Sequence, residues 1–355
     1  MQPPDPERQV QFLANVQRLL SDGSFVATYK FALLLSLADL AVERGDDTTE
    51  SLALDTLDLA EKFVTIYWRQ VLPWVHAGSG NAGVLSQARG SAAAILNHVA
   101  AAHERCQGSL ARLRRDRRAW QRLVKDVGRI ISVMPLWKLQ TVGRDKLDFL
   151  YPNVGSGSQI RLHGEAVYCL RRFRGLIGDL AETAWARFVQ RLPQNLRLIG
   201  EGLDLREFLF GSDRSALAAI RDLLREVDGN GCFYCGRAIH GEPVVDHFVP
   251  WARYPLDLGH NFVLADARCN GFKLDRLSAF DHLEHWCERN AGGAWTAALD
   301  ERLLPHDAAR TRRVAAWAYS QAERAGATVW QEGRDGLIDL DPRWHVLLGA
   351  DLPRG

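Results

Sequence analysis

Four short stretches between Cys232 and Lys273 carry most of the information in this chain: C-F-Y-C-G (232–236), V-D-H-F-V-P-W (245–251), H-N-F-V-L (260–264) and R-C-N-G-F-K (268–273). They combine a cysteine pair, an Asp-His dipeptide and two asparagines within one short segment. A carboxylate and an amide supply the oxygen atoms that hard divalent cations prefer, and a neutral imidazole accepts a proton near pH 7. Together they suit a one-metal phosphodiester hydrolase better than a purely structural role.

The segment also has predictable local structure. Residues 244–251 alternate as a strand, with His247 on one face and Asp246 on the other. Residues 261–265 are an apolar run that predicts a second strand. A helix is expected to start at Cys269 and to continue through Trp286. The predicted order is therefore strand, loop, strand, helix.

These motifs, in this order, resemble the HNH nuclease family, in which two strands and a helix present a histidine base and a divalent metal to a nucleic-acid phosphate. The resemblance implies that Asp246 and Asn270 are ligands of a catalytic Mg²⁺ or Mn²⁺. It implies that His247 is the general base and that Asn261 ties the loop to the strand that carries this base. Lys273, one helical turn after Asn270, is expected to contact the phosphate. The resemblance covers about a sixth of the chain.

The cysteines raise the question of a second metal. Cys232 and Cys235 have the spacing of half a zinc knuckle, and Cys269 lies where the second half is expected. Many HNH domains carry two C-x-x-C pairs here, but this chain has Asp266 in place of the fourth cysteine. Asp266 or His240 is a candidate fourth ligand of a structural Zn²⁺. Packing of the thiols as small buried groups without zinc stays an alternative.

Basic charge is concentrated elsewhere in the chain. Residues 101–135 hold nine basic and three acidic side chains, whereas residues 230–290 hold six basic and eight acidic ones. Arg114, Arg117, Arg118 and Arg122 are expected on one helical surface, as phosphate contacts or as a solvated face. A second basic cluster, at residues 171–174, is the next candidate surface. His260, beside the middle asparagine, is expected in a loop or near the phosphate.

The expected fold class is mainly α with a small α+β module. Residues 1–200 are predicted to form a mainly helical binding or sensing domain, and residues 201–228 a linker and lead-in helix. Residues 229–290 are predicted to form the ββα-metal module, and residues 291–355 a C-terminal helical extension. No apolar run is long enough to span a membrane. The scattered cysteines favour a reducing compartment, so the chain is expected in the cytoplasm.

The sequence thus predicts a metal-dependent endonuclease that hydrolyses nucleic acid, with DNA as the substrate that the resemblance implies. A role in prokaryotic restriction or anti-phage defence is expected by analogy. Two alternatives stay open. One is a partner-activated effector or toxin nuclease, with a protein partner or a second copy bound through the N-terminal helical domain. The other is a non-catalytic nucleic-acid-binding module.

Overall fold

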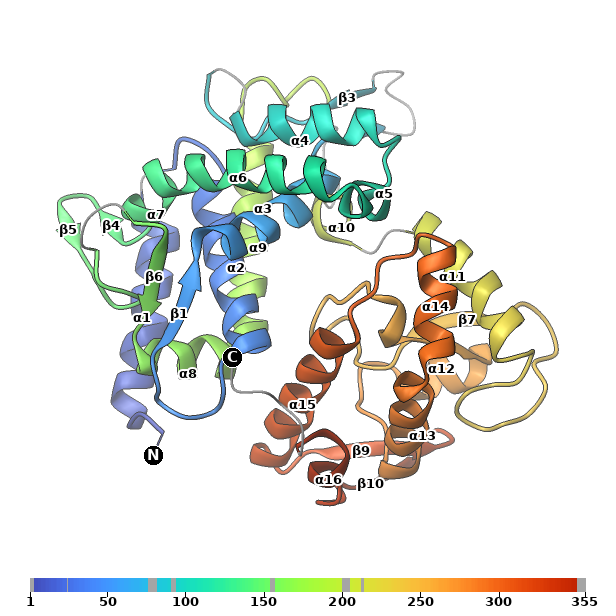
Figure 1. Cartoon of the computed structure of the whole chain (residues 1–355). Coiled ribbons are helices and arrows are strands. Elements are labelled where there is room, and N and C mark those ends of the chain that lie inside the picture. Colours follow the sequence, from blue (N-terminus) through green and yellow to red (C-terminus); the bar gives the residue numbers. More distant parts are fainter. Residues whose placement is uncertain are drawn as a thin grey trace. The chain divides into compact units, whose positions relative to one another are not determined.

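The computed structural model describes residues 3–23, 25–75, 82–90, 94–153, 157–199, 205–211 and 214–349. The chain divides into two compact units, Met1–Gly211 and Ser212–Gly355, called unit 1 and unit 2 below. Both are mainly helical, and the strands pair only into small two-stranded antiparallel sheets (Figure 1). The predicted class, mainly helical with small β elements, is confirmed at this level. No described helix is both long and apolar enough to cross a membrane.

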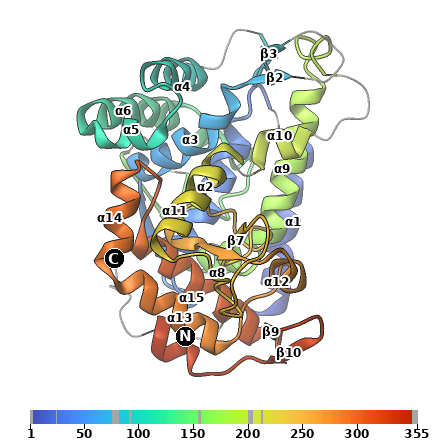
Figure 2. The same ribbon diagram turned by 90° about the vertical axis from the view of Figure 1, so that its right-hand side faces the viewer.

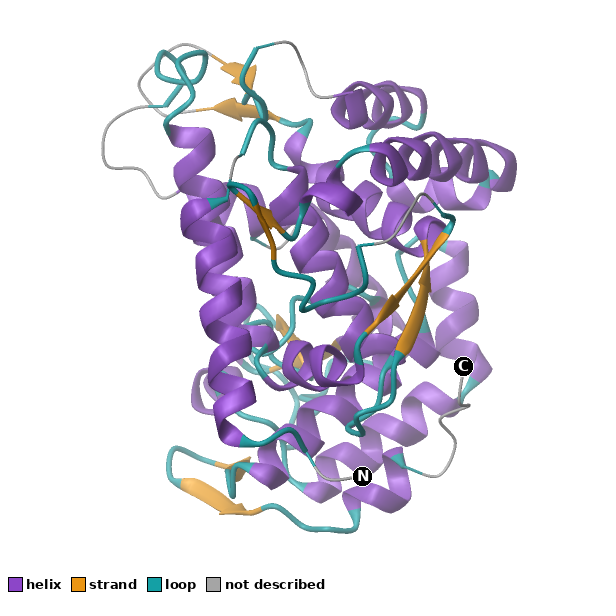
Figure 3. Ribbon diagram, turned by 90° about the vertical axis from the view of Figure 1, so that its left-hand side faces the viewer, coloured by secondary structure: helices purple, strands orange, loops and turns teal. Residues whose placement is uncertain are grey.

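Unit 1 is built from helices joined by short hairpins and loops (Figure 3). Its helices are α1 Pro6–Asp22, α2 Tyr29–Arg44, α3 Thr56–Gln70, α4 Ala94–Arg105, α5 Leu110–Arg115, α6 Arg117–Val133, α7 Pro135–Lys138, α8 Gly164–Arg172, α9 Arg174–Gln190 and α10 Leu205–Phe210. Its strand pairs are β1 Leu52–Asp55 with β6 Gln159–Leu162, β2 Pro73–Val75 with β3 Ala82–Val84, and β4 Thr141–Val142 with β5 Asp145–Lys146.

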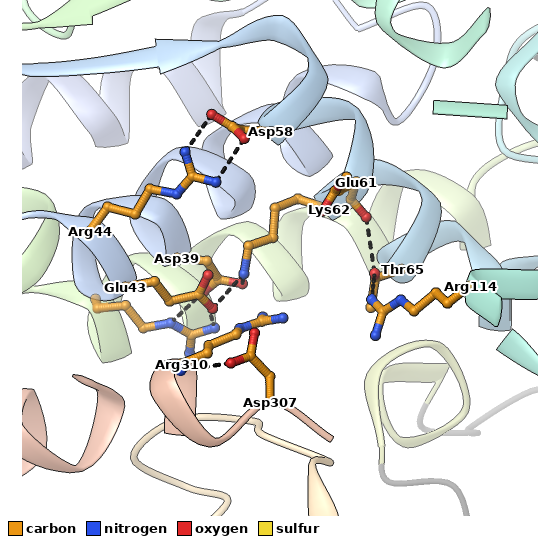
Figure 4. A network of polar contacts seen from close by, with 11 residues as sticks. Asp39, Glu43, Arg44, Asp58, Glu61, Lys62, Thr65, Arg114, Asp307 and Arg310 are labelled. Carbon is orange, nitrogen blue, oxygen red and sulfur yellow. Dashed lines mark hydrogen bonds and ion pairs between the residues drawn. The ribbon is translucent and has the colours of Figure 1, made fainter. Parts of the chain in front are cut away.

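Helix α2 forms the centre of unit 1. Nearly all of its side chains from Phe31 to Glu43 are buried, as expected for a helix that is apolar around most of its circumference. Helices α3, α8 and α9 pack against it. Two acidic side chains of α2, Asp39 and Glu43, lie within this packing. Lys62 of α3 pairs with Glu43 at 2.5 Å (Figure 4). Arg174 of α9 pairs with Asp39 at 2.9 Å, so neither buried charge is uncompensated.

The second basic cluster predicted from the sequence is part of this core. Besides Arg174, the buried Arg171 donates from Nη1 to the carbonyls of Ala41, Val42 and Gly45 at the C-terminal end of α2. Carbonyls at the C-terminal end of a helix lack a full set of intrahelical partners, although that of Ala41 also accepts the N–H of Gly45. A cation there also opposes the negative end of the helix dipole. Arg171 and Arg174 therefore stabilise unit 1, and they are not a surface for phosphate.

Unit 2 contains the segment that the sequence singled out. Its elements are α11 Arg214–Val227, β7 Val244–His247, the 3₁₀ turn η1 Gly259–Asn261, β8 Phe262–Ala265, α12 Ala267–Lys273, α13 Phe280–Ala291, α14 Gly293–Glu301, α15 Ala308–Arg324, β9 Thr328–Glu332, β10 Gly336–Asp339 and α16 Trp344–Leu348. Helix α11 packs against β7 and β8 (Figure 2). The predicted lead-in helix and C-terminal extension thus lie in the same unit as the motif segment. In the predicted linker, residues 201–204 and 212–213 lie outside the described residues.

Strands β7 and β8 pair antiparallel, with Asp246 opposite Val263 and His247 opposite Phe262. Helix α12 follows β8 after one residue, so the order is strand, strand, helix. The predicted continuous helix from Cys269 through Trp286 is wrong. Helix α12 ends at Lys273 because Leu274 takes a left-handed conformation, with φ of 53°, and α13 starts anew at Phe280.

Candidate functional site

The cysteine pair forms a tight turn in front of β7. Cys232 donates its backbone N–H to the carbonyl of Arg237 at 2.9 Å, and Gly236 donates to the carbonyl of Cys232 at 2.8 Å. Gly236 has a φ of 68°, which a residue without a side chain adopts at little cost. Cys269, in the first turn of α12, completes the group: the sulfur atoms of Cys232, Cys235 and Cys269 all lie within 4.8 Å of one another.

Three thiols at this spacing can hold a metal ion such as Zn²⁺. Burial and the neighbouring sulfur atoms raise the pKa of Cys269 to about 12. The pKa of Cys235 is lowered: burial alone would raise it, but the backbone N–H of Arg237 and hydrogen bonds with the other two thiols outweigh that effect. A metal ion would hold all three as thiolates by its own charge.

Asp266, which the sequence suggested as a fourth ligand, has another role. It caps α12: its Oδ1 accepts the backbone N–H of Arg268 at 2.8 Å, and its own N–H points at the sulfur of Cys232 at 3.3 Å. Among the described residues, neither Asp266 nor the exposed His240 belongs to the thiol group. A four-ligand zinc site therefore needs a ligand from outside this group, such as water.

Asn261 holds the loop that follows β7. It is fully buried, and its Oδ1 accepts the backbone N–H of Val249 at 2.9 Å. Its Nδ2 donates to the carbonyl of Val249 at 3.1 Å and to that of Leu256 at 3.2 Å. One amide thus joins the beginning and the end of the loop 248–258. Such a fully satisfied buried amide fixes the local backbone, because losing any of these bonds leaves a polar group unpaired.

His247 lies at the end of β7 with a nearly buried ring. Its Nε2 is 2.8 Å from Oδ1 of Asp257, a residue of the same loop. The ring centroid lies 5.2 Å from that of Trp251 and 4.8 Å from that of Phe262. The side chain is 13% exposed. The imidazole therefore has fixed neighbours and keeps a small exposed fraction.

Asp246 has different partners from those of His247, as the alternation along the strand predicts. Its Oδ2 accepts a hydrogen bond from the hydroxyl of Tyr234 and lies 2.9 Å from Nζ of Lys273. Lys273 also donates to the backbone carbonyl of His247 at 2.9 Å. Burial raises the pKa of Tyr234 well above its usual value and lowers that of Lys273 despite the opposing charge of Asp246. This network links α12 to β7.

Lys273 and Asn270 therefore differ in their surroundings. Lys273 is fully buried, so its ammonium faces Asp246 and is not available to a phosphate in this conformation. Asn270, one turn earlier on α12, is half-buried. The ion pair between Lys273 and Asp246 brings the two elements that carry the predicted metal ligands together. The sequence did not predict that the lysine would be inside the protein.

The predicted basic surface lies on α5 and α6 of unit 1. Arg117, Arg118 and Arg122 are exposed. Arg114 is half-buried, and its guanidinium contacts Thr65 at 3.3 Å (Figure 4). The same guanidinium lies 5.2 Å from the ring centroid of Trp120. The exposed Lys125 and Arg129 continue the stripe along α6 and were not singled out from the sequence, although their spacing from Arg118 and Arg122 is helical.

Three further residues matter to the site or correct an expectation. Tyr234 and Asp257 were not singled out, although Tyr234 lies within the first quoted motif and Asp257 lies in the loop between the second and the third. His260 is buried and is not a loop residue near a phosphate. Its Nε2 lies 3.1 Å from the hydroxyl of Thr296, and burial lowers its pKa to about 4. The sequence distinguished His260 from the motif residue His247 but did not predict that His260 would be buried.

The comparison with known protein families found a match only within unit 1. A family model described as a domain of unknown function (DUF8808) matches residues 9–202, which is more than half of the chain. The matched residues include α5 and α6 and end before the motif segment. No curated protein and no solved structure matches the chain. On the extent of this match, the chain belongs to the DUF8808 family.

Proposed function

We propose that unit 2 contains an HNH-type ββα-metal nuclease module and that the chain is a metal-dependent endonuclease acting on nucleic acid, with DNA as the first candidate. The observation that supports this most is the local architecture. Strand β7, the loop clasped by Asn261, strand β8 and helix α12 carry Asp246, His247 and Asn270 in the order that the family uses. The motif segment is a small folded unit and not a set of isolated matches.

The donor atoms fit a hard divalent cation. Asp246 offers an anionic carboxylate and Asn270 a neutral amide oxygen, the ligand types preferred by Mg²⁺ and Mn²⁺. Oδ2 of Asp246 is engaged by Tyr234 and Lys273. Among the described contacts none uses Oδ1, so this oxygen is free to act as a ligand. A cation held there would stabilise the charge that develops on the phosphate during attack.

The side chains of the protein account for the other requirements. His247 takes the proton of the attacking water. The oxygen of that water forms a bond to phosphorus while the bond to the 3′ oxygen breaks, and the leaving oxygen takes a proton from solvent. Lys273 holds the carboxylate of Asp246 in place at the buried end of the site, because its ammonium lies 2.9 Å from Oδ2. Asn261 keeps the loop beside His247 in one conformation.

A second function has one observation in its favour. Because Asp246 is held by Lys273 and Tyr234, the module also fits a nucleic-acid-binding domain without catalysis. The two functions differ in their response to chelation. Catalytic turnover requires the divalent cation, whereas binding through basic side chains does not.

The test is cleavage of plasmid, linear and single-stranded DNA and of RNA, with Mg²⁺ or Mn²⁺ and with EDTA. We expect metal-dependent cleavage by the wild type and a loss of about 10²- to 10⁴-fold in His247→Ala, the usual contribution of a general base. His345→Ala is the matched control, since His345 is 54% exposed on α16 and pairs with Glu323. Near wild-type cleavage by His247→Ala would show that the base has been misassigned.

A further inference from the structure

The contact between His247 and Asp257 has a consequence for the chemistry of the base. Asp257 follows Leu256 and precedes Leu258, and both leucines are buried, with 2% and 5% exposure. The carbonyl of Leu256 accepts the amide of Asn261. The backbone on both sides of Asp257 is therefore held, by the burial of the two leucines and by the hydrogen bond from Asn261. This held backbone keeps the carboxylate of Asp257 beside His247.

The ring of His247 is equally restricted. Trp251 and Phe262 flank it, with ring centroids 5.2 Å and 4.8 Å away. With Nε2 at 2.8 Å from Oδ1 of Asp257, the imidazole is restricted by two aromatic neighbours and by a contact at one nitrogen. Nδ1 makes no hydrogen bond among the described contacts.

We propose that Asp257 is the positioning residue of the base: it holds His247 in the Nε2–H tautomer, so that Nδ1 carries the lone pair that accepts the proton of water. An ionised carboxylate only accepts hydrogen bonds, so a neutral imidazole in contact with it must carry its proton on Nε2. When Nδ1 takes the proton of water, the ring becomes an imidazolium and the carboxylate of Asp257 stabilises it. This inference rests on the proposed nuclease function. It assigns a role to Asp257, which belongs neither to the quoted motifs nor to the Asp246-His247 dipeptide.

The tautomer can be measured without any activity. Long-range ¹H–¹⁵N NMR of the full chain labelled with ¹⁵N-histidine distinguishes a protonated Nε2 from a protonated Nδ1. We expect the resonances of His247, assigned by their absence in His247→Ala, to show the Nε2–H form in the wild type. In Asp257→Asn we expect a mixture of tautomers, because an amide can either donate or accept. A wild-type His247 protonated on Nδ1 would overturn the proposal.

Kinetics supply the second measurement. Asp257→Asn should lower kcat by about 10²-fold or more with KM changed less than about threefold, because only the transition state contains the imidazolium. Asp257→Glu, which keeps the carboxylate, should restore part of the rate; a purely structural role would not predict this rescue. The control is Asp335→Asn, the same change at an exposed residue of the β9–β10 turn.

The outcomes separate this inference from the proposed function. If the wild type cleaves nucleic acid and Asp257→Asn does so at the same kcat, Asp257 has no positioning role and the nuclease assignment stands. If the wild type cleaves no substrate with any metal, the proposed function fails, and the role of Asp257 fails with it. If Asp257→Asn has a lowered melting temperature, which indicates a folding defect, the kinetic test instead compares the kcat of Asp257→Glu with that of Asp257→Ala.

Discussion

At the scale of single residues, the main finding is that Asp246 has two kinds of partner. In this structure its Oδ2 is bound by Tyr234 and Lys273, which compensate its charge inside the protein. A divalent cation would use the remaining oxygen together with Asn270. In the proposed site, the buried ammonium and the metal would contact different oxygens of the same carboxylate.

The two predicted ligands can be tested directly. Asp246→Ala and Asn270→Ala should each weaken Mn²⁺ binding by at least about tenfold, because each removes one of two protein oxygen ligands. Calorimetric titration of the full chain measures this. Asp335→Ala, which removes an exposed carboxylate of unit 2, should bind Mn²⁺ as the wild type does. Unchanged affinity in both ligand variants would contradict the one-metal site.

At the scale of elements, the thiol turn supports the strand pair. Phe233, between the two cysteines of the turn, donates its backbone N–H to the carbonyl of Leu264 in β8 at 2.8 Å. Cys269 connects the same group to the first turn of α12. A metal bound by the three thiols would therefore brace β8 and α12 without entering the proposed catalytic site.

Cys232→Ser with Cys235→Ser should lower the melting temperature of unit 2 by more than about 5 °C, whereas cleavage at low temperature should fall much less. Calorimetry and measurement of bound zinc by mass spectrometry test this, with Cys106→Ser in unit 1 as the control. Absence of bound zinc in the wild type together with an unchanged melting temperature in the double variant would leave these thiols as minor packing groups.

Helix α6 shows how one element produces a charged surface. Its apolar residues Leu123, Val124, Val127 and Ile131 are buried, and α3 and α4 pack against this helix. The helical period then leaves its arginines on the opposite, exposed side. The basic stripe is thus a consequence of amphipathic packing, and this physical origin explains its exposure without deciding whether it binds phosphate.

At the scale of the whole molecule, we expect the two units to divide the work. The exposed arginines of α6 should bind nucleic acid, and unit 2 should cut it. Replacing Arg114, Arg117, Arg118 and Arg122 by Gln should weaken binding and reduce the log–log salt dependence by roughly one unit for each lost phosphate contact. Turnover at saturating substrate should change little.

Fluorescence anisotropy at several salt concentrations measures this slope. The matched control replaces Arg8, Arg18 and Arg44 of unit 1 by Gln; each of these already pairs with a carboxylate, so their loss should leave the slope nearly unchanged. Equal slopes for the quadruple variant and the wild type would show that these arginines of α5 and α6 form only a solvated face.

The sequence by itself determined the local features of this protein. Apolar alternation and helical periodicity predicted the mainly helical class and the strands around His247 and Phe262, because these patterns depend on neighbours within a few residues. The order of the motifs predicted that Asp246 and His247 lie at the end of the first of these strands. The cysteine spacing predicted that Cys232, Cys235 and Cys269 converge, and the structure brings their sulfur atoms together without Asp266.

Only the tertiary structure decided the roles that depend on partners distant in sequence. Burial of Lys273 against Asp246, 27 residues away, turns an apparent surface lysine into an internal counter-ion. Arg171 and Arg174 serve the core because α2 presents carbonyls and a carboxylate to them. Asp257 reaches His247 because Asn261 closes the loop between them. Such pairings depend on how elements pack, and no local pattern encodes them.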